Sequence, residues 1–136
     1  MKKYIGTKQI EASPMTMGEA HEKGLLQADR VPNEAQKTAP GYHVRYPDGY
    51  ESWSPAETFE KTYRVADTFL DRMYIELGDL NEKRRKLGCF IESDNFKKLP
   101  SSNQHLLMVQ IGVMTSYAYI LLERIISEEK EEEKEK

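Results

Sequence analysis

The last third of the chain carries the pattern that most constrains the fold, because its apolar residues recur at the spacing of a packed helix. Steps of four and three residues separate Leu107, Ile111, Met114, Ala118, Leu121 and Ile125. A second series comprises Leu70, Met73, Leu77, Leu80 and Leu87, with Arg84 in one slot. Such spacing is typical of helices that pack lengthwise against each other. We therefore expect two long helices, over 69–87 and from about Ser102 past Ile125, to form an antiparallel hairpin.

Helix starts are marked by three candidate capping boxes, each a Ser or Thr followed three residues later by an acidic residue. They are Thr16 with Glu19, Ser54 with Glu57, and Thr68 with Asp71. They predict a short helix to about Lys23, a second from Pro55 to about Arg64, and the first long helix. Between the long helices, Gly88, Asp94-Asn95 and Pro100 predict a connector without regular structure.

The stretch GYHVRYPDGYESWSP, residues 41–55, predicts a β-hairpin. Tyr42, Val44 and Tyr46 alternate with polar residues, as in a strand with one buried face. Pro47-Asp48-Gly49 supplies turn chemistry, and a second short strand follows. Residues 3–12 predict a further strand, and 24–40 a loop.

These elements predict an α+β fold, with a small N-terminal antiparallel sheet and a C-terminal helical hairpin. We expect one structural unit in three portions: 1–54 with the sheet, 55–127 with the helices, and 128–136 as an acidic tail. The tail is most simply a solvated extension of the last helix.

Composition narrows the classes of partner. The formal net charge of −3 lacks the basic excess that holds nucleic-acid polymers, so we expect none to bind. No apolar run approaches the ~18 residues of a membrane span, so none is predicted. The single cysteine, Cys89, excludes an internal disulfide and fits a reducing cytosol. The N-terminus lacks the apolar core of a signal peptide.

Apolar residues also flank both sides of the seam on the last helix, among them Met108, Tyr119, Val113 and Ile120. A helix that is apolar over most of its circumference is buried on several sides. In a monomer this small a second chain is the expected cover, so we predict a homo-oligomer built through the hairpin.

Enzyme signatures are absent. The chain has no glycine-rich phosphate loop and no nucleophile elbow, and His21, His43 and His105 lack metal-ligand spacing. Cys89 has no neighbouring histidine to activate it. We expect no catalytic residue, no metal and no cofactor.

One polar stripe on the last helix contains Asn103, Gln110, Tyr117 and Arg124, spaced by seven. It is either an ordinary solvated face or a ligand surface, since amides, a phenol and a guanidinium can bind a base edge and a phosphate. Gly112 beside it indicates close approach, by a crossing helix more often than by a ligand.

Aromatic residues add a second possible ingredient. Phe90 and Phe96 lie in the connector and Trp53 at the end of the β-hairpin. Each is either core packing or a stacking surface for a purine. Arg64 and Arg124, near helix ends, are either surface charges favoured by the helix dipole or phosphate partners.

Two long segments resemble a known family. KYIGTKQIEASPMT and GYHVRYPDGYESWSPAETFEKTYR resemble the front half of the type I Thoeris anti-defence proteins of bacteriophages. TFLDRMYIEL through LLMVQIGVMTSYAYILLERI is similar to the helical hairpin that this family shares with phage anti-CBASS proteins, including the run Gln110-x-Gly112-x-Met114. The resemblance covers most of the chain except 24–40 and the acidic tail.

The resemblance implies a sponge rather than an enzyme. Such proteins bind cyclic ADP-ribose isomers, or cyclic di- and trinucleotides at a separate site, and hold them intact in the cytoplasm of the infected bacterium. Their sites lie between subunits of a dimer, or of a hexamer built as a trimer of dimers. The resemblance makes Phe90 or Phe96 the stacking residue and Asn95 or Asn103 the base reader. Arg64 and Arg124 become the phosphate partners, although Tyr119 departs from a basic residue common in relatives.

Two rival hypotheses stay open. The first keeps the fold and exchanges the ligand for a cyclic di- or trinucleotide. The second is a structural or adaptor protein whose helical seams serve assembly alone.

Overall fold

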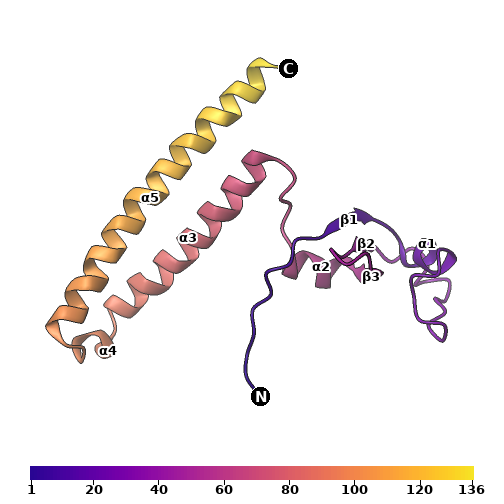
Figure 1. Cartoon of the computed structure of the whole chain (residues 1–136), viewed down its shortest axis with the longest axis horizontal. Coiled ribbons are helices and arrows are strands. Elements are labelled where there is room, and N and C mark those ends of the chain that lie inside the picture. Colours follow the sequence, from indigo (N-terminus) through magenta and orange to yellow (C-terminus); the bar gives the residue numbers. More distant parts are fainter. The chain divides into compact units, whose positions relative to one another are not determined.

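The computed structural model describes residues 1–136, which divide into two compact units, Met1–Arg64 and Val65–Lys136. The first unit contains a three-stranded antiparallel sheet and two short helices. The second contains the long helices (Figure 1). The predicted α+β class is confirmed.

The sheet has the strand order β1-β2-β3, with β1 at Glu11–Pro14, β2 at Gly41–Arg45 and β3 at Glu51–Pro55. The predicted first strand exists, but its bounds of 3–12 are wrong, because residues 1–10 have no regular structure and the strand begins at Glu11. β1 pairs with β2 from Glu11 opposite Arg45 to Pro14 opposite Tyr42. Since β2 ends at Arg45, residues before Glu11 have no strand to pair with.

The predicted β-hairpin is confirmed, and its turn uses the expected chemistry. The amide of Tyr46 donates to the carbonyl of Tyr50 at 2.8 Å. Gly49 has a φ of +90°, which favours glycine, and Asp48 Oδ1 accepts from the amide of Tyr50 at 3.0 Å.

The first unit has a small core to which α1, Met17–Glu22, contributes. The predicted N-cap of this helix is present, since the Thr16 hydroxyl accepts from the amide of Glu19 at 3.2 Å. Trp53 lies in this core and donates its indole N–H to the carbonyl of Met15 at 2.8 Å. Its other buried members are Met15, Met17 and Ala20. Trp53 is therefore core packing rather than a free stacking surface.

The capping box predicted at Ser54 and Glu57 is wrong. β3 continues through Pro55, which pairs with Gly41, so Pro55 becomes the N-cap of α2, Ala56–Thr62, without a side-chain cap. Phe59 of α2 stacks on Tyr42 with ring centroids 4.1 Å apart. This aromatic contact fastens α2 to the sheet.

The second unit is a helical hairpin of α3, Phe69–Ile91, and α5, Ser101–Lys134, with the short α4, Asp94–Lys97, at its turn (Figure 1). Thr68 and Asp71 form both bonds of the predicted capping box. Gly88 does not end α3, which continues to Ile91. A Cβ at Gly88 would lie 3.6 Å from Ile111 Cδ1, so this glycine packs against α5.

The two predicted seams are confirmed, since Met73, Ala118, Leu121 and Ile125 are the buried residues of the hairpin. The remaining apolar surface of α5 is exposed in the single chain. Its large exposed residues are Leu106, Met108, Val109, Val113, Tyr117, Tyr119, Ile120 and Leu122. The hairpin alone therefore leaves much of α5 uncovered.

One window of α5 is long and apolar enough to cross a membrane by length and composition, with a mean hydropathy of 1.5 and only 11% of it buried. The prediction that no segment reaches this level is wrong. An average over the helix tolerates polar residues such as Gln110 and Ser116, which interrupt the continuous apolar runs.

Candidate functional site

One group of the predicted ligand residues lies at the turn end of the hairpin. Phe90 and Phe96 form an edge-to-face pair with ring centroids 6.2 Å apart. Asn95 lies beside them on α4, and Asn103 on the first turn of α5, both exposed. The turn is fixed by Gln104, whose side-chain amide donates to the carbonyl of Leu99 at 2.9 Å. Two aromatic rings and two side-chain amides thus lie at the turn end of the hairpin.

A second group lies at the open end, where α3 begins. The guanidinium of Arg124 lies 5.8 Å from the centre of the Phe69 ring, a cation–π contact between exposed groups. Tyr117 donates its hydroxyl to Glu76 of α3, and Tyr74 donates to Glu129 of α5. This end offers a cation positioned against the ring of Phe69.

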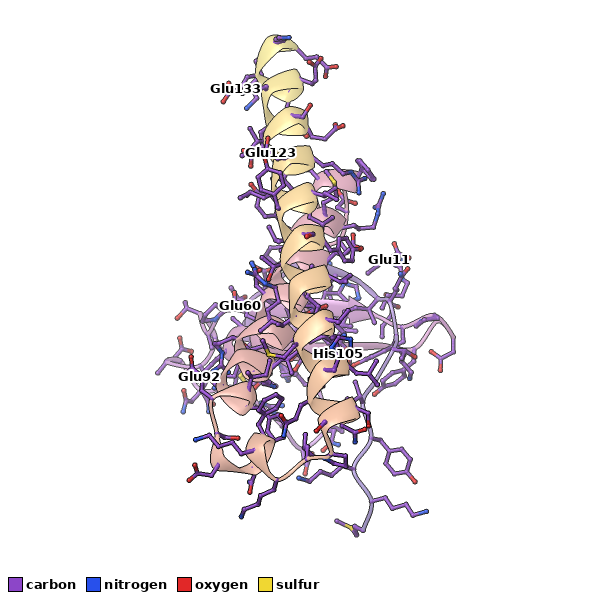
Figure 2. The ribbon with its side chains drawn as sticks, turned by 90° about the vertical axis from the view of Figure 1, so that its left-hand side faces the viewer. Glu11, Glu60, Glu92, His105, Glu123 and Glu133 are labelled. Atoms are coloured by element: carbon purple, nitrogen blue, oxygen red, sulfur yellow. The ribbon has the colours of Figure 1, made fainter.

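The two ends are too far apart to act on one small ligand within a single chain. Asn103 and Arg124 are 21 residues apart on α5, which at 1.5 Å per residue is about 31 Å. Figure 2 shows the separation through His105 near the turn and Glu123 well along the helix. The ends of the predicted stripe therefore fall in two separate candidate groups, the turn-end group and the open-end group, which we call half-sites.

The middle of the stripe gives a mixed result. Gln110 is exposed, whereas Tyr117 donates its hydroxyl to Glu76 of α3. Part of the stripe therefore connects α5 to α3 within the hairpin. Gly112 has no atom within 4 Å of where its Cβ would be, so α3 is not the crossing helix that the sequence indicated. Nothing within the single chain therefore requires a glycine at this position.

Arg64 belongs to the other unit of the chain. It is the last residue of the first unit and is exposed, whereas both half-sites lie in the second unit. Its role as a phosphate partner stays a prediction.

The sequence also missed a cationic hollow on the hairpin, lined by Asn81, Arg84, Arg85, Ile111 and Thr115. The available signal was Arg84, a cation in a slot of an otherwise apolar seam. From periodicity alone, Arg84 in that position indicates that the apolar packing is interrupted there, and it does not indicate a binding site.

Two exposed carboxylates, Glu82 and Glu51, have a pKa that a hydrogen-bonded cationic partner lowers. A hydrogen bond from Arg85, with Nη2 2.7 Å from Glu82 Oε1, lowers the pKa of Glu82. In the sheet, the hydrogen bond between His43 Nε2 and Glu51 at 2.9 Å, aided by Arg45, lowers the pKa of Glu51. Both carboxylates are held in the ionised form that pairs with a cation.

The side chains that commonly bind metal ions are not gathered into one group. No three His, Cys, Asp or Glu side chains are gathered so that they could hold an ion. Cys89 is exposed and free.

Comparison with known proteins bears on the hairpin. A family model described as Sequestin matches residues 67–127, just under half of the chain. The matched region contains all of α3 and α4 and most of α5, and so both half-sites and the hollow. No curated protein and no solved structure matches the chain.

Proposed function

We infer that this protein is a sponge that binds a cyclic ADP-ribose isomer and holds it without degrading it. The observation that carries this proposal is the Sequestin match, whose name denotes sequestration and whose span contains both half-sites. The sequence resemblance to type I Thoeris anti-defence proteins of bacteriophages supplies the ligand class. The proposed place of action is the cytoplasm of the infected bacterial host.

The separation of the half-sites supports a site shared between two copies. In an antiparallel arrangement with two-fold symmetry, the turn end of one hairpin lies beside the open end of the other. Phe90 or Phe96 would then stack on the adenine and Asn95 or Asn103 would read its edge. Arg124 of the second copy would bind the pyrophosphate, because the planar guanidinium donates to two oxygens at once.

The exposed surface of α5 supports the same assembly. The large apolar residues that α3 leaves uncovered need a cover, and a second hairpin offers an equal apolar surface. A lipid cover is the less favourable choice. It would bring the run Lys83, Arg84, Arg85 and Lys86 of α3 toward hydrocarbon, and charges there are costly. We therefore propose a dimer, or a hexamer of three dimers, with no membrane and no nucleic-acid polymer as partner.

Sequestration needs affinity rather than turnover. A rigid turn and a two-helix frame limit the ordering that binding would otherwise require. Cys89 and His105 lie near the turn, but no three His, Cys, Asp or Glu side chains are gathered so that they could hold a metal ion. We propose a binding protein without a cofactor.

The test is a retention assay. The purified protein is incubated with a cyclic ADP-ribose isomer, desalted and heated, and the released small molecule is identified by mass spectrometry. We expect intact ligand, in a ratio of about one per half-site pair. A chemically altered product would contradict the sponge and indicate an enzyme.

The same assay with cyclic di- and trinucleotides separates the rivals. Retention of these ligands alone would assign the hairpin to the anti-CBASS type, which the run from Gln110 to Met114 resembles. Retention of neither class would favour the adaptor hypothesis.

A further inference from the structure

The hollow on the hairpin lies midway between the two half-sites. It has a volume of about 390 Å³ and is formed by Asn81, Arg84 and Arg85 of α3 with Ile111 and Thr115 of α5. Eight residues of α5 separate Ile111 from Asn103 and nine separate Thr115 from Arg124, so each half-site is about 12–14 Å away. The hollow is therefore separate from both half-sites and is formed by a single chain.

Arg84 is the unusual residue in this hollow. Its Nη1 donates to Asn81 Oδ1 at 2.8 Å, whereas its Nε is buried and has no hydrogen-bond partner. Buried donors in folded proteins are nearly always paired, and a guanidinium that lacks acceptors is unfavourable there. If packing were the only role of residue 84, Leu or Met would fill this position in the seam better than Arg.

The helix opposite Arg84 offers it no carboxylate. On α3, Glu82 pairs with Arg85 and with Lys86. On the opposite helix, no Asp or Glu occurs from Ser101 to Leu122. Figure 2 labels Glu123, the first acidic residue of α5, well along the helix from His105. The hollow thus combines two guanidinium groups with a buried donor that has no acceptor.

We propose that this hollow is a binding site for a phosphoryl oxyanion, present once in each chain and separate from the site shared between copies. Rotation of the Arg84 side chain brings Nε and Nη2 toward two oxygens of the anion, the geometry that guanidinium and phosphate favour. The hydrogen bond to Arg84 occupies the oxygen of Asn81, which leaves its amide N–H₂ as a further donor. Arg85 also lines the hollow, and its guanidinium is paired with Glu82.

Isothermal titration of the full-length protein with inorganic pyrophosphate tests the proposal. The test variant is Arg84→Met, and the matched control is Lys83→Met, which removes the same charge from the adjacent exposed residue. We expect one pyrophosphate per chain, binding at least tenfold weaker in Arg84→Met and within twofold of the original in Lys83→Met. Equal weakening in both variants would reduce the effect to general charge and overturn the site, as would an absence of pyrophosphate binding.

A melting experiment without ligand separates binding from folding. Since Arg84 is poorly satisfied in the free protein, we expect Arg84→Met to raise the melting temperature while it weakens pyrophosphate binding. A lower melting temperature would show that Arg84 stabilises the hairpin itself and would contradict the proposal. Retention of cyclic ADP-ribose should survive in Arg84→Met, so the two proposals can fail independently.

Discussion

The two units of this protein bury their apolar residues in different ways. The first unit gathers Met15, Met17, Ala20 and Trp53 into a core that α1 and the sheet close by themselves. In the hairpin, α3 covers one seam of α5 and leaves its other apolar faces exposed. The difference teaches that the first unit has a closed core of its own, whereas the hairpin leaves apolar surface exposed that the proposed second copy would cover.

Charge is divided in the same way. In the sheet, His43 and Arg45 are matched by Glu51 on the neighbouring strand. In the hairpin, α3 and α5 each carry nine charged residues, but α5 carries no acidic residue before Glu123. The part of α5 that lines the hollow with Arg84 therefore offers it no carboxylate.

The largest effect should come from a charge placed on the uncovered face of α5. Ile120→Glu would bury an unpaired carboxylate if a second copy covers this face, so we expect the assembly to dissociate to monomers and ligand retention to be lost. Light scattering coupled to size exclusion measures the mass. Ser127→Glu, which adds the same charge beyond the apolar part of α5, should leave the assembly intact. If Ile120→Glu also assembles normally, the face is not an interface.

A smaller but substantial effect is expected in the core of the first unit. A Cβ added by Gly41→Ala would lie 2.4 Å from the Trp53 ring and 2.5 Å from the carbonyl of Ser54. We expect the free energy of unfolding to fall by about 1–3 kcal/mol. Hydrogen exchange should show the loss in residues 1–64, with α3 and α5 unaffected. Gly6→Ala, where nothing lies within 4 Å, is the control. A loss spread equally over both units would contradict their independence.

Arg124→Ala should weaken ligand retention at least tenfold, which corresponds to about 1.4 kcal/mol. Its contact with the Phe69 ring is exposed and contributes about 0.5–1 kcal/mol, so the melting temperature should change little. Lys130→Ala removes a cation from the same helix outside the half-site and should retain ligand normally. Equal retention in the two variants would remove Arg124 from the site.

The smallest expected effect is the difference between alanine substitutions at two glycines with similar surroundings. Gly78 of α3 and Gly112 of α5 are both mid-helix, and neither has an atom within 4 Å of its Cβ position. Alanine favours a helix over glycine by about 1 kcal/mol, so Gly78→Ala should raise the melting temperature of the hairpin. Gly112→Ala should instead weaken assembly, because the added methyl group would stand where a second copy packs. If both variants simply stabilise the protein, Gly112 is not at an interface.

Much of this fold could be predicted from local patterns. The steps of four and three predicted the seams, Thr68 with Asp71 predicted the start of α3, and Asp48-Gly49 predicted the turn of the sheet. The errors lie where long-range pairing overrides local preference. Pairing with Gly41 extends β3 through Pro55 and removes the cap at Ser54, while packing against Ile111 carries α3 through Gly88.

The candidate site was harder to predict for a geometric reason. A seven-residue repeat places Asn103 and Arg124 on one face but does not indicate whether one ligand can reach both, which the length of α5 excludes within one chain. The hollow was missed because the burial of Arg84 Nε depends on the contact between two helices, which periodicity does not describe. Sequence patterns thus identified faces, and the structure was needed to show which residues meet.

A mixing experiment tests the central claim, that two copies share each ligand site, most directly. Arg124→Ala and a variant that combines Asn103→Ala with Phe96→Ala are each expected to lose retention. After they are mixed, unfolded and refolded together, random pairing into two-fold dimers should restore about a quarter of the original ligand sites, because each mixed dimer contains one unaltered site. Recovered ligand at that level supports the account. No recovery, with mixed dimers verified by native mass spectrometry, would contradict it.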